Sequence, residues 1–382
     1  MKLTKLTEKK KLMLISAACV IALAVILWPL LAISKYNYAS ADDWSYGVHT
    51  YQVIQNHGGL IAFIQAIIET VQESFWEARF ANIALATLQP GIFGEHCYAI
   101  VAYLMIGSII FSEMYLLAQC IGKENRGLIL PISIPMIMIQ LLYCPFPEES
   151  FYWYTGAVNY TGIYSLSLIL IGLVLKLATR ELKMADRILS LVIACILAIL
   201  VGGDNLATSL STFCLLVLLE IVFLAKNKDG FRRTWFVVLV NIASLCIVCF
   251  STRTQTRLEW NFEGDTLYSP LMAIWESFVR TFLNIVSWTN LKMLLLLLNV
   301  QETSSYRAYR MWKNGWAQAY GEGWEERFKV LKDDSVKDVV FTPLYPVELI
   351  MYADLQPEDG YTWVNYSCAK YYGKESITVV TE

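Results

Sequence analysis

The sequence predicts an all-α polytopic membrane protein with seven or eight transmembrane helices, followed by a small soluble C-terminal segment of mixed helix and strand. Hydrophobic residues make up 56% of the 382-residue chain and charged residues only 16%, a balance that disfavours a water-soluble fold. Several apolar runs approach the roughly 20 residues that a helix needs to cross about 30 Å of hydrocarbon. Short charged loops separate these runs, as in multi-span proteins.

The apolar runs define the expected spans in chain order. Candidate spans cover residues 12–33, 98–121, 128–143, 160–177, 188–201, 206–225 and 235–250, and an eighth is expected within 271–298. The first run follows three lysines, as a signal peptide would, but it is longer than the about 7–15 apolar residues of such a peptide. We therefore expect it to be retained as a span.

Lys and Arg are unevenly distributed among the loops. They gather before the first span, between spans two and three, between spans four and five, and before span seven. The positive-inside rule places these segments in the cytoplasm. We therefore expect a multi-pass protein of the cell membrane with a cytoplasmic N terminus. Two basic loops on one side require an even number of crossings between them, so 188–201 and 206–225 should form a hairpin.

Two parts of the chain lie outside this pattern of spans. The loop 34–97, within the transmembrane domain 1–298, is long enough to hold structure of its own, and its 59–73 segment repeats apolar residues at three- and four-residue steps. This spacing predicts an amphipathic helix, either in the membrane interface or packed on the spans. Residues 299–382 are more polar and predict a soluble α+β segment, with strands near 339–341 and 377–380. Eight crossings would leave that segment in the cytoplasm, whereas seven would leave it outside. Its side therefore depends on whether 271–298 crosses the membrane.

Asp42 and Asp43 follow the first span closely and should face the outer side. Adjacent carboxylates can share a divalent cation, or one can act as a general base while the other orients it or raises its pKa. A solvated acidic pair is the simpler alternative.

The other outer loops combine acids with aromatic residues. Aromatic faces stack on sugar C–H groups and carboxylates accept bonds from hydroxyls, although aromatic residues also gather at membrane interfaces. The guanidinium of Arg79 matches phosphate oxygens, with structural ion pairing as the alternative. The candidate substrate-binding residues are Arg79, Glu148, Glu149, Trp153, Tyr154, Asn159, Asp204 and Asn205.

These segments resemble the GT-C type of membrane glycosyltransferase, and more closely a poorly characterised bacterial family of large envelope membrane proteins related to it. The resemblance is carried by residues 40–47, 76–80, 152–160, 202–205, 363–365 and 371–373. It implies a GT-C-like helical bundle, a polyprenyl-phosphate-linked sugar donor, and Asp42 or Asp43 as general base or metal ligand. The chain departs from the pattern at Ala78, where the family usually has Gly, and it lacks the usual Pro-Gly-Asn-type turn after span seven.

The sequence thus predicts transfer of a sugar from a lipid-linked donor to an envelope glycan or lipid acceptor on the outer face, in contact with membrane lipids. A net charge of −3 does not suggest nucleic-acid binding. The alternatives are a non-enzymatic envelope membrane protein and a transporter of lipid-linked glycans. A transporter should place polar groups at mid-membrane, often in two related halves, whereas here the acids gather in outer loops.

Overall fold

A computed structural model describes residues 2–74, 78–254, 300–344, 347–357 and 363–380, together with the isolated positions 256, 279 and 283. Within these residues, seven stretches are long and apolar enough to cross a membrane. They are Glu8–Tyr36, Glu95–Cys120, Glu124–Leu142, Tyr154–Thr179, Met184–Gly202, Leu206–Lys226 and Lys228–Cys249. The architecture fits an all-α polytopic membrane protein, and each of the first seven expected spans overlaps one of these stretches. The eighth, within 271–298, lies outside the described stretches.

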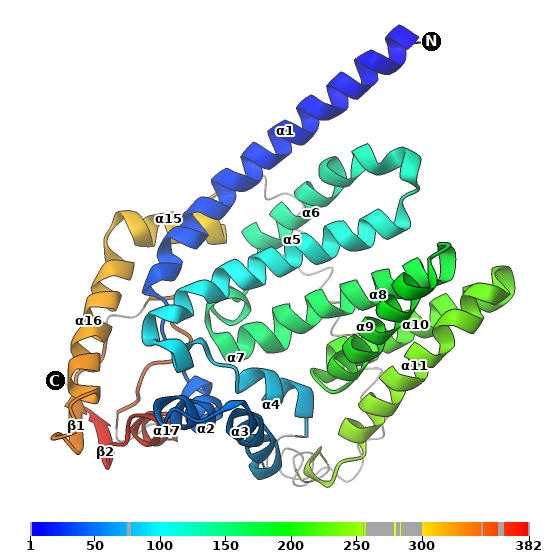
Figure 1. The fold of residues 1–382 in the computed structure, drawn as a ribbon. Helices are drawn as coiled ribbons and strands as arrows, with labels where there is room; N and C mark the ends of the chain where they lie inside the picture. Colours follow the sequence, from blue (N-terminus) through cyan, green and yellow to red (C-terminus); the bar gives the residue numbers. More distant parts are fainter. Residues whose placement is uncertain are drawn as a thin grey trace.

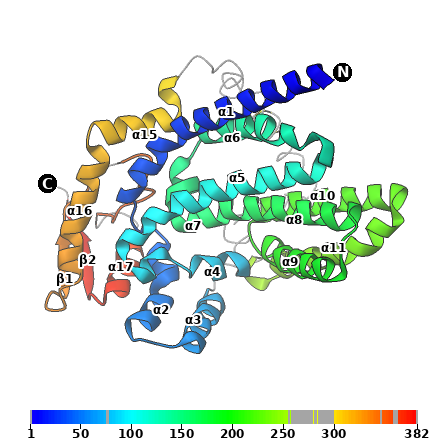
Figure 2. The ribbon, with the colours of Figure 1, turned by 45° about the horizontal axis from the view of Figure 1, so that its top comes forward.

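The spans correspond to the long helices, which run side by side in both views (Figures 1 and 2). They are α1 (Lys2–Ile33), α5 (Ile100–Cys120), α6 (Ile129–Leu142), α8 (Ile163–Thr179), α9 (Met184–Gly202), α10 (Leu206–Lys226) and α11 (Lys228–Cys249). The fourth span begins earlier than hydropathy alone predicted, because α7 (Tyr154–Ala157) and a π-helical turn precede α8. The fifth begins at Met184 and is therefore longer than its apolar run.

Small residues allow the spans to approach one another closely. At Gly202, an added Cβ would lie 2.6 Å from the carbonyl oxygen of Asn241, so only glycine permits this distance between α9 and α11. Asn241 in turn donates a hydrogen bond to the carbonyl of Ala198, 3.1 Å away. Small interfacial residues and interhelical hydrogen bonds are the usual means of packing helices in lipid, where no hydrophobic effect drives them together.

The described residues of the loop 34–97 form three α-helices, besides short 3-10 turns, at one end of the bundle, which we call the loop side (Figure 1). They are α2 (Asp43–Gln55), α3 (Leu60–Glu73) and α4 (Phe80–Ala86). The amphipathic helix predicted for 59–73 is therefore confirmed as α3. Its Ala66 and Thr70 are buried, whereas Leu60 and Ile61 are 74% and 76% exposed. The predicted contact of α3 with the membrane interface stays a prediction.

The C-terminal segment has the expected mixture of helix and strand. It contains α15 (Ser304–Lys313), α16 (Trp316–Leu331), β1 (Asp338–Phe341), α17 (Trp363–Tyr372) and β2 (Ser376–Val379). The two strands pair in parallel, with Asp338 opposite Ser376 and Phe341 opposite Val379.

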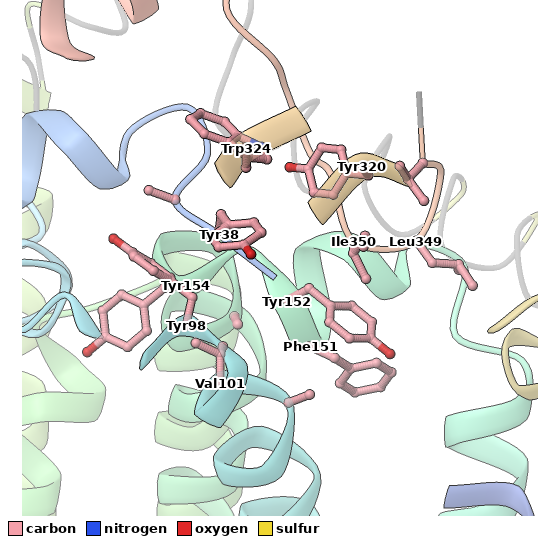
Figure 3. Packing of buried hydrophobic residues seen from close by; sticks show 14 of the residues in the cluster. Tyr38, Tyr98, Val101, Phe151, Tyr152, Tyr154, Tyr320, Trp324, Leu349 and Ile350 are labelled. Carbon is pink, nitrogen blue, oxygen red and sulfur yellow. The ribbon is translucent and has the colours of Figure 1, made fainter. Parts of the chain in front are cut away.

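This segment packs on the loop side of the bundle. Ser305, in α15, donates a hydrogen bond of 2.9 Å to the carbonyl of Ile26 in α1, and Tyr38 donates one of 3.0 Å to Glu325 in α16. In Figure 3, Tyr38 lies beneath Trp324, and their rings are 6.0 Å apart. The C-terminal segment and the loop 34–97 therefore share one core and lie on the same side of the spans.

Candidate functional site

The cavity that contains Asp42 lies on the loop side and has a volume of about 380 Å³. Four parts of the chain line it: the start of α2, the segment at the start of α4, residues 153–160 and the start of α17. Its lining residues are Asp42, Tyr46, Arg79, Asn82, Trp153, Thr155, Gly156, Asn159, Tyr160 and Trp363. The structure thus brings four predicted site residues together, namely Asp42, Arg79, Trp153 and Asn159.

Asp42 is presented by a tight turn immediately before α2. Ala41 adopts a φ of 49°, in the left-handed region that costs a residue with a Cβ about 1 kcal/mol or more. The turn is closed by two hydrogen bonds: the amide of Asp43 donates to the carbonyl of Ser40, and the amide of Ser40 donates to the carboxylate of Asp43, each at 3.0 Å. The turn leaves Asp42 partly exposed in the cavity, while Asp43 points inward.

Asp43 is completely buried and accepts three hydrogen bonds. Its Oδ2 accepts from the amide of Ser40, and its Oδ1 accepts from the amide and the hydroxyl of Thr155, at 3.0 and 2.7 Å. Burial raises the pKa of Asp43 to about 7, although the bonds from Thr155 and Ser40 act in the opposite direction. The two adjacent acids therefore have different surroundings, and Asp43 positions the turn that carries Asp42.

A chain of buried hydrogen bonds extends from Asp43 into the protein. Thr155 Oγ1 accepts a bond of 3.1 Å from the side-chain amide of Gln89, and Gln89 Oε1 accepts one of 3.0 Å from the hydroxyl of Tyr98. Gln89 also donates to the carbonyl of Ala86, 2.8 Å away. Because these groups are satisfied by one another, the network fixes α2, the 153–160 segment and the turn that precedes α5 relative to each other.

Arg79 lies at the N-cap position of α4, and its guanidinium donates to the side-chain oxygen of Asn159 at 3.2 Å. The start of α4 is held by the α9–α10 hairpin, because the amide of Ala81 donates to the carbonyl of Gly203 at 3.0 Å. An added Cβ at Gly203 would lie 2.3 Å from the ring of Phe80. The hairpin that the loop charges predicted thus supports the segment that carries Arg79.

Aromatic side chains form much of the remaining wall. Trp153 stacks on Tyr352, with ring centroids 3.8 Å apart and planes 1° from parallel. Trp363 reaches the cavity from the start of α17, and Tyr46 and Tyr160 complete the aromatic lining. Sequence reasoning missed Tyr352 altogether. The only available signal for Tyr46 and Trp363 was their place in the motif segments, because no local pattern shows that the C-terminal segment folds over this cavity.

Glu148 and Glu149 lie near the cavity but are not among the described residues that line it. They begin a π-helical turn, Glu148–Tyr152, that leads to Trp153. Burial raises the pKa of Glu148. Burial also raises the pKa of the Tyr352 hydroxyl, and the carboxylates of Glu149 and Asp42 raise it further. Tyr352 therefore lies within electrostatic range of both Asp42 and the Glu148–Glu149 pair.

The other predicted site residues have structural contacts. Asn205 caps α10 by accepting bonds from the amides of Ala207 and Thr208. Asp204 is fully buried and accepts a bond of 2.7 Å from the Asn205 amide. The hydroxyl of Tyr154 donates to the carbonyl of Leu85 at 3.1 Å. None of these three predicted residues is among the described residues that line the Asp42 cavity.

A mainly apolar groove in the span region adjoins the cavity. It has a volume of about 350 Å³ and shares Tyr160 with the Asp42 cavity. Gln140 and Tyr164 contribute polar groups to it from α6 and α8, and Ser150 and Thr161 line its loop-side part. The groove and the Asp42 cavity are therefore neighbours at Tyr160.

The surroundings of Asp43 do not fit a cation bound between the two carboxylates. Three hydrogen-bond donors point at its oxygens, whereas a divalent cation needs acceptor atoms directed at the metal. Within the described residues, no group of three or more His, Cys, Asp or Glu side chains is placed to hold a metal ion.

Comparison of the chain with models of known families, with curated proteins and with solved structures gave no match in any of the three.

Proposed function

We propose that the protein is a GT-C-like glycosyltransferase of the cell membrane, with its N terminus in the cytoplasm and its loop side facing outward. It transfers a sugar from a polyprenyl-phosphate donor to a cell-envelope acceptor. The observation that carries the proposal is the cavity in which the carboxylate of Asp42 meets an Arg79–Asn159 pair and aromatic walls. A base, a phosphate-binding cation and ring faces for sugars are the groups that such a reaction requires.

In the proposed reaction, Asp42 removes the proton from an acceptor hydroxyl as that oxygen attacks the anomeric carbon of the donor sugar. The bond between the anomeric carbon and the phosphate oxygen breaks, and its electron pair leaves with the polyprenyl phosphate. Attack opposite the leaving group inverts the configuration at the anomeric carbon. The guanidinium of Arg79 stabilises the charge that develops on the departing phosphate, and Asn159 orients that guanidinium.

The groove next to the cavity supports a lipid-linked donor. It is lined by side chains of the spans and adjoins the cavity at Tyr160. An apolar carrier chain can remain in the membrane beside the groove while its sugar phosphate enters the cavity. A water-soluble nucleotide sugar would have no need of an entrance among the spans.

The proposal is tested with purified protein in lipid nanodiscs, given polyprenyl-phosphate sugar and an envelope extract as acceptor. Asp42→Asn should reduce transfer at least about a hundredfold, as expected when a general base is lost, and should leave the melting temperature unchanged because Asp42 is only partly buried. Asp186→Asn removes an exposed carboxylate in α9 and is the matched control. Full transfer by Asp42→Asn would overturn the assignment of Asp42 as the base.

Neither alternative function would form a glycosylated product in this assay. In sealed vesicles, a transporter would move the intact sugar lipid across the bilayer, whereas a non-enzymatic envelope protein would not. In cells, Asp42→Asn at normal protein level should change the envelope glycans. Unchanged glycans would favour a structural role.

A further inference from the structure

A second cavity lies on the loop side between the loop 34–97 and the C-terminal segment. Its volume of about 770 Å³ falls within the range of about 300–1,000 Å³ that is usual for ligand sites. The side chains important here are Tyr51, Gln55, Phe93, Glu95, Lys332 and Tyr371.

The walls of this second cavity combine aromatic rings with charged groups that leave no surplus positive charge. Tyr51 stacks on Tyr371, with ring centroids 4.0 Å apart, and Phe93 is 76% exposed. The carboxylate of Glu95 pairs with the ammonium of Lys332 at 2.8 Å. Asp334, which also lines the cavity, adds a negative charge. Because the walls therefore carry no surplus positive charge, they suit a neutral polyhydroxyl ligand better than a phosphate.

Two helices connect the second cavity to the Asp42 cavity. Helix α2 follows Asp42 at its start and lines the second cavity with Tyr51 and Gln55 toward its end. Helix α17 packs on α2 and runs from Trp363 at the first cavity to Tyr371 at the second (Figure 1). At 1.5 Å per residue, the helical path from Asp42 to Tyr51 is about 13 Å.

We propose that the second cavity binds a distal segment of the acceptor, and that the acceptor is therefore a neutral glycan several sugars long. This inference rests on the proposed function, since the other end of the glycan would present its hydroxyl to Asp42. A glycan of one or two sugars would be too short to occupy both cavities.

The test measures binding rather than transfer. Oligosaccharides are released from the envelope polysaccharide of the source cells by mild acid hydrolysis, separated by length, and titrated calorimetrically into the full chain in nanodiscs. Affinity should rise once the fragments exceed about 13 Å in length. Phe93→Ala should weaken binding of the long fragments about tenfold and leave binding of the shortest fragments unchanged, because Phe93 contacts only the distal segment.

Phe250→Ala is the matched control, because Phe250 is 79% exposed and is not among the described residues that line either cavity. It should bind long fragments as the unsubstituted protein does. Affinity that is independent of length, or long fragments that bind Phe93→Ala normally, would overturn the proposal. Asp42→Asn, which should lose transfer, should retain this binding. If the unsubstituted protein bound long fragments in a Phe93-dependent way and yet transferred no sugar, that result would refute the proposed function and leave the second cavity as a glycan-binding site.

Discussion

Replacing Thr155 with valine tests the interpretation that Asp43 positions the site. Valine has nearly the same shape, but it lacks the hydroxyl that donates to Asp43 at 2.7 Å and accepts from Gln89 at 3.1 Å. Above pH 7, where Asp43 is mostly ionised, a hydrogen bond to its charged carboxylate contributes about 1.5–3 kcal/mol. The side-chain amide of Gln89 would also lose one of its two acceptors. We therefore expect Thr155→Val to lower the free energy of unfolding by about 2–3 kcal/mol. For a chain of 382 residues, that loss corresponds to a fall in melting temperature of about 2.5–4 °C.

The assay is thermal unfolding in nanodiscs at one fixed scan rate, because large membrane proteins generally unfold irreversibly and their midpoints depend on the rate. Thr155→Ser is the matched control: it keeps the hydroxyl and loses one methyl group, which costs about 1 kcal/mol. Thr155→Val should also reduce transfer, because the turn that carries Asp42 would be less firmly held. A valine variant that melts within about 1 °C of the unsubstituted protein, or a serine variant as unstable as the valine variant, would refute this reasoning.

Three further predictions concern pH, the aromatic wall and the hairpin. The pKa of Asp43 rises from 3.8 in the unfolded chain to about 7 in the folded protein. The contribution of Asp43 to the free energy of unfolding should therefore be greatest below about pH 4 and should fall by up to about 4 kcal/mol as the pH rises to 7. Asp43→Asn should remove this dependence from melting curves recorded across that range, and an unaltered pH profile would contradict the prediction. Trp363→Ala should raise the KM for acceptor about tenfold at an unchanged melting temperature, because Trp363 is 42% exposed at the cavity. Tyr366→Ala, on the same helix, should have no effect. Equal KM values for the two variants would show that the aromatic wall does not bind the acceptor. Gly203→Ala should displace Phe80 at the start of α4 and with it the neighbouring Arg79, so transfer should fall. Normal transfer by correctly folded Gly203→Ala protein would show that the hairpin does not position Arg79.

The spans were readable from the sequence because hydropathy and loop charge are local properties. A helix in lipid must satisfy its own backbone hydrogen bonds, so an apolar run of sufficient length has little choice of structure. The parity of the basic loops also predicted the hairpin of α9 and α10. The fourth span was less accurately bounded, since residues 154–162 are helical but contain glycines and polar groups that interrupt the apolar run.

The site was only partly readable. Asp42, Arg79, Trp153 and Asn159 were chosen for their chemistry and do line one cavity. Asn205 was chosen on similar grounds, but its side-chain oxygen caps a helix. An asparagine before an apolar helical run is a common N-cap, so the sequence also indicates this structural role.

The sequence by itself determined that the chain crosses a membrane repeatedly and that an acidic pair follows the first span. Only the tertiary structure decided which acid enters the cavity. Asp43 is buried because Thr155, 112 positions further along the chain, donates to it, and the aromatic wall exists because the C-terminal segment folds back onto the loop side. Burial and hydrogen-bond partners depend on such distant contacts, so two neighbouring carboxylates that look equivalent in the sequence have different pKa values and different roles in the fold.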